Sequence, residues 1–266
     1  MASDPVAPLI AAVIFLLAAG ILLAEPAFGR GGRIGLWLGS AGAAILGGAL
    51  IARGLRADHW PLTSEYEFAL AFALALALAS VVLTLGQGTQ TRAIQAVAMI
   101  LVAVLVVYAR LGLPAHRRAI QTLPPALDSV WLPMHVGTAA LAYGALALAG
   151  VAGLIRLIRG SDRPAAEHLL QRAIAIGYPL LTLSIIFGMI WAQVAWGRYW
   201  GWDLKERWTL ITWLVYTLYW HLYRRPRWQG RRVAWLALMG MAAVLITFVG
   251  VGWLTRTVGL ASLHLF

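Results

Sequence analysis

Long apolar runs separated by short polar connections are the main pattern in this chain. A helix needs roughly 20 mainly apolar residues to cross the hydrocarbon core of a bilayer, and about eight segments qualify. These segments are residues 6–25, 33–53, 66–86, 92–112, 131–157, 173–195, 208–223 and 232–255. The pattern predicts an all-α fold, a polytopic transmembrane helix bundle of about eight spans.

The composition agrees with a membrane protein. Of the 266 residues, 61% are hydrophobic and 12% are charged, whereas about a quarter of the residues in an ordinary soluble domain are charged. Since no stretch is polar enough to form a separate soluble domain, we expect residues 1–266 to form a single transmembrane domain. The run at 6–25 lacks the positive flank of a cleavable signal peptide, so it is expected to be a true first span.

The chain contains no cysteine. Disulfide bonds, thiolate metal sites and thiol catalysis within the chain are therefore excluded. Any thiol chemistry connected with its function must belong to a partner.

Basic residues are distributed unevenly between the two sides of the predicted bundle. The connections after the first, third, fifth and seventh spans carry more than half of the 21 lysine and arginine residues. They are Arg30, Arg33, Arg92, Arg156, Arg159, Arg163, Arg172, Arg224, Arg225, Arg227, Arg231 and Arg232. Because cytoplasmic loops are enriched in Lys and Arg, we predict that both termini and the connection between the sixth and seventh spans are extracytoplasmic. The net charge of +11 suits contact with anionic lipid, and nucleic acid is not expected as a partner.

Tryptophans gather around the connection between the sixth and seventh spans. Six of the 13 tryptophans lie within residues 191–213, together with two glycines and several charged residues. An aromatic belt at the membrane interface explains two or three such residues per helix end, but not this density. Broad flat apolar surfaces with a few polar groups are what a large planar ligand with propionates needs. We therefore predict a ligand platform, with Arg198, Lys205 and Arg207 as candidates to bind the propionates.

Three stretches of sequence resemble a known family. Residues 196–213, continuing to His221, closely resemble the tryptophan-rich "WWD" signature of the CcsA-type haem proteins of system II cytochrome c synthesis. Further resemblance lies in residues 61–67 and 125–136, so that it covers the chain from about residue 59 to the C-terminus. The resemblance implies haem b as the cofactor and residues 191–213 as the WWD haem-binding segment.

The resemblance also implies roles for individual side chains. His135 and His264 are predicted to ligate the haem iron on the outer side, where the topology alone brings both to the level of the platform. The remaining predicted haem contacts in the segment are Trp196, Trp200, Trp202, Asp203 and Trp208. For both histidines, the alternative is an interfacial residue without a ligand.

His221 lies at the opposite end of the seventh span, roughly 20 Å from Trp208 at 1.5 Å per residue. The resemblance implies that it contributes to an inner haem site, and an interfacial histidine near the headgroups is the alternative. Asp203 and Glu206 are expected to orient the loop or hold a histidine tautomer. Glu67 is expected to pair with an arginine or cap a helix, with a site role as the alternative.

The function implied by the resemblance is cytochrome c biogenesis. The chain would transport haem b across the cell membrane and present it for thioether attachment to the Cys-Xaa-Xaa-Cys-His segment of apocytochrome c. It would be the haem-binding part of a holocytochrome c synthase and act with a CcsB-type partner that has an extracytoplasmic domain. The alternative functions are a subunit that loads a haem chaperone, a membrane b-type cytochrome, and a transporter without cofactor.

Overall fold

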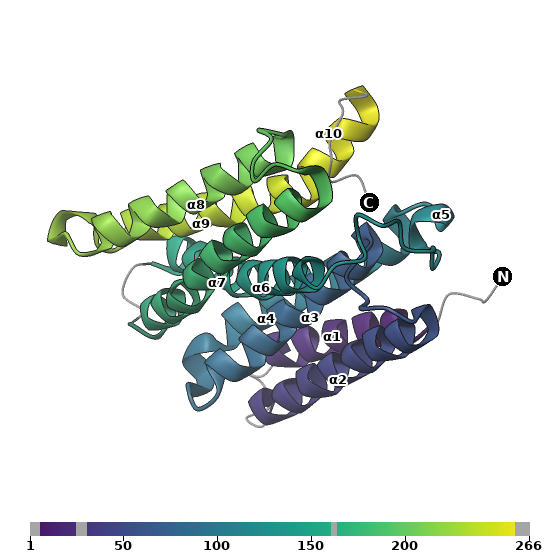
Figure 1. Cartoon of the computed structure of the whole chain (residues 1–266). Helices are drawn as coiled ribbons and strands as arrows, with labels where there is room; N and C mark the ends of the chain where they lie inside the picture. The colour runs from purple at the N-terminus through teal and green to yellow at the C-terminus, as the bar shows by residue number, and fades with distance from the viewer. Residues whose placement is uncertain (1–5, 25–30, 161–163, 259–266) are drawn as a thin grey trace.

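The structure, a computed structural model, describes residues 6–24, 31–160 and 164–258, and these residues form helices and connections with no strand (Figure 1). The long helices are α1 (Ala7–Ala24), α2 (Gly31–Ala57), α3 (Glu65–Thr84), α4 (Arg92–Val107), α6 (Trp131–Arg159), α7 (Pro164–Trp196), α8 (Leu204–Tyr223) and α9 (Arg231–Leu245). The short helices and helical turns are η2 (Gly88–Thr91), η3 (Tyr108–Gly112), α5 (Ala115–Arg118), η4 (Pro226–Trp228), η5 (Ile246–Gly250) and α10 (Val251–Val258). The all-α prediction is confirmed.

In the part of the chain that the structure describes, seven helical segments are long and apolar enough to cross a membrane. They correspond to every predicted span except the one at 208–223. That span lies within α8, which has 20 residues but begins with the charged run Lys205, Glu206 and Arg207. The structure therefore supports a multi-pass membrane protein whose seventh predicted span is an aromatic-rich helix with a charged start. The sixth predicted span is longer than expected, because α7 starts at Pro164 rather than at residue 173.

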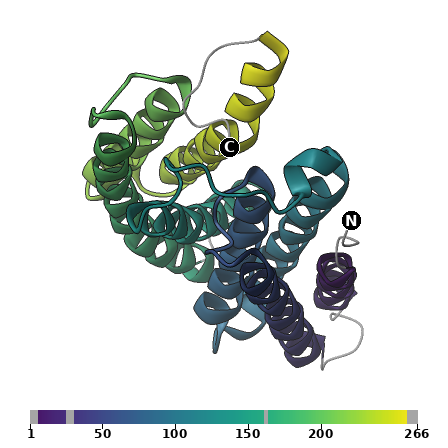
Figure 2. The ribbon, with the colours of Figure 1, turned by 45° about the vertical axis from the view of Figure 1, so that its right-hand side comes forward.

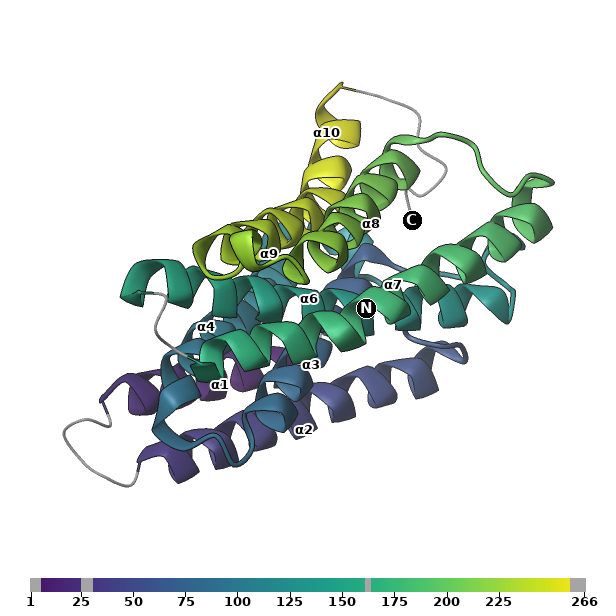
Figure 3. The ribbon, with the colours of Figure 1, turned by 90° about the vertical axis from the view of Figure 1, so that its left-hand side faces the viewer.

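Helix α6 is the central helix of the bundle. It packs against α7, α9 and α3, and α1 packs against α2 and α4 further away. Figures 2 and 3 show α8 and α9 on one side of the molecule and α1 and α2 on the other, with α6 between them. The central position of α6 explains why most of its residues between 139 and 156 are buried.

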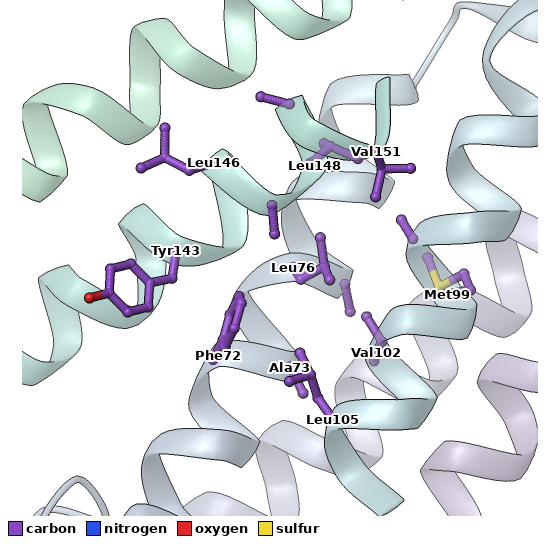
Figure 4. Close-up of a cluster of buried hydrophobic side chains, with 14 of the residues drawn as sticks. Phe72, Ala73, Leu76, Met99, Val102, Leu105, Tyr143, Leu146, Leu148 and Val151 are labelled. Carbon is purple, nitrogen blue, oxygen red and sulfur yellow. The ribbon is translucent and has the colours of Figure 1, made fainter. Parts of the chain in front are cut away.

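Helices α3 and α6 approach each other closely. A Cβ on Gly144 would lie 2.6 Å from backbone atoms of Ala75 and Leu76, so only glycine fits there. Beside this contact, the rings of Phe72 and Tyr143 pack edge to face with centroids 5.8 Å apart. Figure 4 shows these rings with aliphatic side chains from α3, α4 and α6 around them. Such small-residue contacts suit a membrane bundle, in which helices associate through packing rather than by exclusion of water.

The chain direction brings several functional stretches to one end of the bundle. Helices α3, α6 and α8 begin at this end, and α7 finishes there. We call it the cavity end, because residues from the starts of α3, α6 and α8 and from the loop before α8 line a common cavity there. They are Leu62, Thr63, Ser64, Glu65, Leu132, His135, Val136, Tyr199, Trp200, Lys205 and Glu206. The opposite end carries the arginines where α6 and α8 finish and where α7 and α9 begin.

Candidate functional site

The cavity lies between α3, α6, α7, α8 and η5, and it contains about 1260 Å³ of space that no protein atom fills, its open mouth included. Its walls are mainly apolar and aromatic, with Phe68, Trp191 and Trp200 among them. The polar side chains in the walls include Glu65, Arg117, His135, Ser184, Lys205 and Glu206. The combination of flat apolar walls with a few polar groups is typical of a site for a small organic ligand or cofactor.

His135 lies in the second turn of α6 and lines the cavity. Its Nδ1 is 2.8 Å from the backbone carbonyl oxygen of Ser184 on α7. A carbonyl oxygen only accepts hydrogen bonds, so in the neutral ring Nδ1 carries the proton and Nε2 carries the lone pair. Histidines that bind metals commonly donate their other ring N–H to a carbonyl or carboxylate in this way, which fixes both the tautomer and the ring orientation.

Two residues of α7 position the His135 ring. Trp191, which is only 1% exposed, stacks on the imidazole with ring centroids 6.0 Å apart and an interplanar angle of 16°. The indole Nε1 of Trp191 donates a 2.9 Å hydrogen bond to the carbonyl oxygen of Ala126, which fixes Trp191 to the connection before α6. Gly188 lies directly beside the ring, since a Cβ there would be 2.7 Å from Nδ1 of His135.

The connection between α7 and α8, residues 197–203, closes one side of the cavity, and we call it the tryptophan loop. Trp200 lines the cavity, and Trp202 packs edge to face on Trp200 with centroids 5.8 Å apart while being 58% exposed. Trp196 packs on Trp191, with centroids 4.7 Å apart. The aromatic residues therefore form two pairs, of which one supports His135 and the other faces the cavity and the surroundings.

Asp203 and Glu206 hold the backbone of this loop. The Asp203 carboxylate accepts from the backbone N–H of Glu206 at 2.8 Å, and the Glu206 carboxylate accepts from the N–H groups of Gly201 and Asp203 at 2.9 and 3.1 Å. This reciprocal capping box begins α8. Trp202 has a φ of +57°, a conformation that bulky residues rarely adopt, and Arg207 Nε donates to its carbonyl oxygen at 2.6 Å. Of the two roles expected for the acidic pair, the structure supports loop orientation.

The opposite wall of the cavity comes from the start of α3. Glu65 accepts from Tyr108 Oη at 2.7 Å and from Arg117 Nη1 at 2.9 Å, and both Glu65 and Arg117 line the cavity. Glu67 does not line it. Its buried carboxylate pairs with Arg53 at 2.7 Å and caps α3 through the backbone N–H groups of Thr63 and Ser64, so that the expected pairing and capping are both found.

The cavity contains only some of the predicted site residues. Of those that the structure describes, His135 and Trp200 line it, whereas Trp196, Trp202, Asp203, Trp208 and His221 do not. His221 is exposed at the far end of α8, with Nδ1 2.8 Å from the carbonyl oxygen of Thr217. His264 lies outside the described residues. Among the candidate propionate contacts, Lys205 lines the cavity, and Arg198 and Arg207 are exposed outside it.

Within the described residues, no three His, Cys, Asp or Glu side chains gather to hold a bare metal ion. The cavity instead offers a single oriented imidazole in an aromatic enclosure. This donor set suits a metal that arrives in a planar organic chelate, which needs only axial ligands from the protein.

Residues 62–258 match the family described as cytochrome C assembly protein. The chain belongs to this family. The match begins beside the cavity-lining start of α3 and includes His135, the tryptophan loop and α8. This match, together with relatives that are named cytochrome c biogenesis protein CcsA, confirms the resemblance, and the chain is a CcsA-type cytochrome c biogenesis protein.

Three relatives of this CcsA-type chain carry the name cytochrome c biogenesis protein CcsA. It is 33% identical to the cytochrome c biogenesis protein CcsA of Synechococcus elongatus, with 82% of this chain and 85% of the relative aligned. It is 33% identical to CcsA of Prochlorococcus marinus subsp. pastoris, over 77% of this chain and 76% of the relative. It is 35% identical to CcsA of Guillardia theta over 57% of this chain, which spans 60% of that protein.

Proposed function

We propose that this CcsA-type protein holds haem b in the cavity, with His135 as an axial ligand of the iron, and presents it for attachment to apocytochrome c. The observation that carries the proposal is the hydrogen bond from His135 Nδ1 to the Ser184 carbonyl, because it leaves the lone pair on Nε2 of a ring that lines the cavity. The fit is also supported by the aromatic walls, which include Phe68, Trp191 and Trp200.

The second axial ligand is proposed to be His264. It follows α10, and Gly252 of that helix lines the cavity. Two imidazoles from this chain would hold the iron firmly during presentation. Trp200 would contact the ring directly, while Trp196, Trp202 and Trp208 would support or surround the platform.

The proposed contribution of the chain to the reaction is positioning and shielding. When bound, haem would supply two vinyl groups as the acceptors of the apocytochrome thiols, an S–H addition that needs no oxidant. His135 would hold the iron, Trp200 would fix the plane, and the loop braced by Glu206 would keep the vinyl edge accessible. The thiols must come from the substrate because this chain has none.

The proposed location is the cell membrane, with the cavity on its extracytoplasmic side. This orientation is supported by the arginines at the opposite end of the bundle, since cytoplasmic loops are enriched in basic residues. Haem would enter from that end near His221 and move to the cavity. A CcsB-type partner of system II would supply the extracytoplasmic domain.

Absorption spectra of purified variants test this function. We expect the wild-type chain to carry low-spin haem and His135→Ala to lose it or shift its spectrum, with recovery on addition of imidazole. His116→Ala is the matched control, since His116 is an exposed histidine at the cavity end. An unchanged spectrum of His135→Ala, with its haem content intact, would exclude His135 as the ligand.

A further inference from the structure

Four side chains join α7 and α8 one turn beyond the cavity-lining residues Leu181 and Thr209. They are Tyr178 and Thr182 on α7 and Trp213 and Thr217 on α8, and we call them the clasp. The rings of Tyr178 and Trp213 stack with centroids 5.9 Å apart and an interplanar angle of 27°. These two helices follow each other in the chain, yet they have few other contacts, so the clasp is the main connection between them.

The hydrogen bonds of the clasp are reciprocal. Trp213 Nε1 donates to Thr182 Oγ1 at 3.0 Å, and Tyr178 Oη lies 2.9 Å from Thr217 Oγ1. Each threonine gives its own proton to a carbonyl of its own helix, Thr182 to Tyr178 and Thr217 to Trp213. A hydroxyl group has one proton, so in both contacts the aromatic residue is the donor and the threonine of the other helix is the acceptor.

The clasp lies between the cavity and His221. On α7 the cavity-lining residues extend inward to Leu181, and on α8 they extend inward to Thr209. Trp213, Thr217 and His221 follow Thr209 at successive intervals of four residues, which forms one ridge along the helix surface. The Nδ1 atom of His221 contacts the carbonyl of Thr217 at the inner end of this ridge. A ligand that moves along the ridge from His221 to the cavity must pass the stacked rings.

The clasp is built so that it can open. Both threonine protons keep their partners when the helices separate, because those partners are on the same helix as the threonine. Pro179 lies inside α7 directly after Tyr178 and removes one backbone hydrogen bond there, which is a common cause of bending in a helix. The stacked rings can also exchange their contact with each other for contact with the faces of a planar molecule, since aromatic faces stack on either.

We infer that the clasp is an aromatic gate and transit site, at which Tyr178 and Trp213 part to let a planar tetrapyrrole pass between α7 and α8 into the His135 cavity. The inference rests on the proposed function and adds a specific route and a closed state to it. Closure separates the cavity from the inner end of the bundle.

A reversible cross-link tests the gate. Because the chain has no cysteine, Tyr178→Cys with Thr217→Cys creates its only thiols. A short bis-methanethiosulfonate, which forms a reducible disulfide with each thiol and releases sulfinate, can bridge the gap that tyrosine now fills. The reagent is applied to cells that make haem only when fed 5-aminolevulinate, and the precursor is added afterwards. Since a covalently closed gate removes the open state, we expect haem in the purified protein to fall about tenfold or more and to return on reduction. A Leu55→Cys variant, whose thiol lies exposed on α2 away from the clasp and the cavity, should load normally after the same treatment.

Haemin added to the purified proteins in detergent separates the possible failures. The gate predicts that linked and reduced proteins bind it equally, because the cavity is reached from its mouth. Normal loading of the linked protein in cells would overturn the gate, and so would equal loss of binding in detergent, which would locate the defect in the cavity. If the wild type fails to bind haemin through His135, the proposed function fails instead.

Discussion

Gly188 decides whether the His135 ring can keep its orientation. The Nδ1 of this ring would be 2.7 Å from a Cβ at position 188, so even alanine requires the imidazole to move. The backbone of Ser184, one turn earlier on α7, supplies the carbonyl that fixes the tautomer. A glycine and a carbonyl on one helix therefore set the chemistry of a histidine on another.

We expect Gly188→Ala to weaken haem binding by about tenfold, which corresponds to about 1.4 kcal/mol, because the displaced ring loses its hydrogen bond to Ser184. A haemin titration followed by absorption measures the change. Gly137→Ala on α6 is the matched control, since its Cβ would meet only Leu62 at an ordinary 3.7 Å. Equal affinities of the two variants would contradict this role of Gly188.

At the scale of single residues, the sequence predicted His135 as a site residue but not the residues that orient its ring. His135 could be selected because it stands near the start of a predicted span and within a stretch that resembles the family. Ser184 is 49 residues away, and its contribution is a backbone carbonyl, which every residue has. Gly188 and Trp191 gave no separate signal as supports of the ring, because close contacts between helices leave no local pattern.

At the scale of single elements, the start of α8 shows how a loop of bulky residues is given a fixed shape. The Asp203 and Glu206 carboxylates satisfy the backbone N–H groups that a helix start leaves without partners. The bond from Glu206 to Gly201 extends this order to the loop that carries Trp200 and Trp202. The loop can therefore hold Trp202 in the left-handed region at φ +57°.

Glu206→Ala should loosen the loop more than it destabilises the bundle. It removes the acceptor of two backbone N–H groups, and a lost cap costs about 1 kcal/mol. Hydrogen exchange at residues 197–203 should accelerate, and haemin affinity should fall several-fold. Glu206→Gln keeps an acceptor oxygen and should recover most of the protection, whereas protection in the alanine variant equal to wild type would contradict the bracing role.

The capping box could be predicted from the spacing of an acidic residue and Glu three positions later at the edge of an apolar run. The structural role of Asp203 was thus visible in the sequence, and its predicted contact with haem stays a prediction. The left-handed conformation of Trp202 could not be predicted, because tryptophan at such a position goes against its local preference. It depends on Arg207, which binds the Trp202 carbonyl.

For the whole molecule, the sequence predicts which segments form helices better than it predicts which helices pack against each other. Apolar length predicted the segments that became α1 to α4, α6, α7 and α9. It did not predict that α6 would contact α3, α7 and α9 together, because these contacts depend on small residues that are frequent throughout the chain. Helix α8 differs from the other predicted spans in its composition. It has a charged first turn, and it is rich in tryptophan, tyrosine and threonine.

Gly144→Ala should lower the thermal stability of the bundle strongly. The added methyl group meets backbone atoms of α3 at 2.6 Å, which cannot rotate away, and overpacking of this kind costs about 1–3 kcal/mol or more. Gly48→Ala on α2 is the control, because a Cβ there meets nothing within 4 Å. Melting curves in detergent should show a large decrease for Gly144→Ala and little change or a small increase for Gly48→Ala. Similar melting temperatures would argue against close contact of α3 and α6.

The central position of α6 has a consequence for quality control in the cell. The helix that presents His135 is also the one on which α3, α7 and α9 assemble, so a ligand on this histidine binds a surface that exists only when the bundle is complete. Ligand that binds only the assembled state adds about 2.7 kcal/mol to its stability at 100 times the dissociation constant. Loaded protein would then resist proteases longer than empty protein, and supply of the ligand would regulate how much of the chain persists in the membrane.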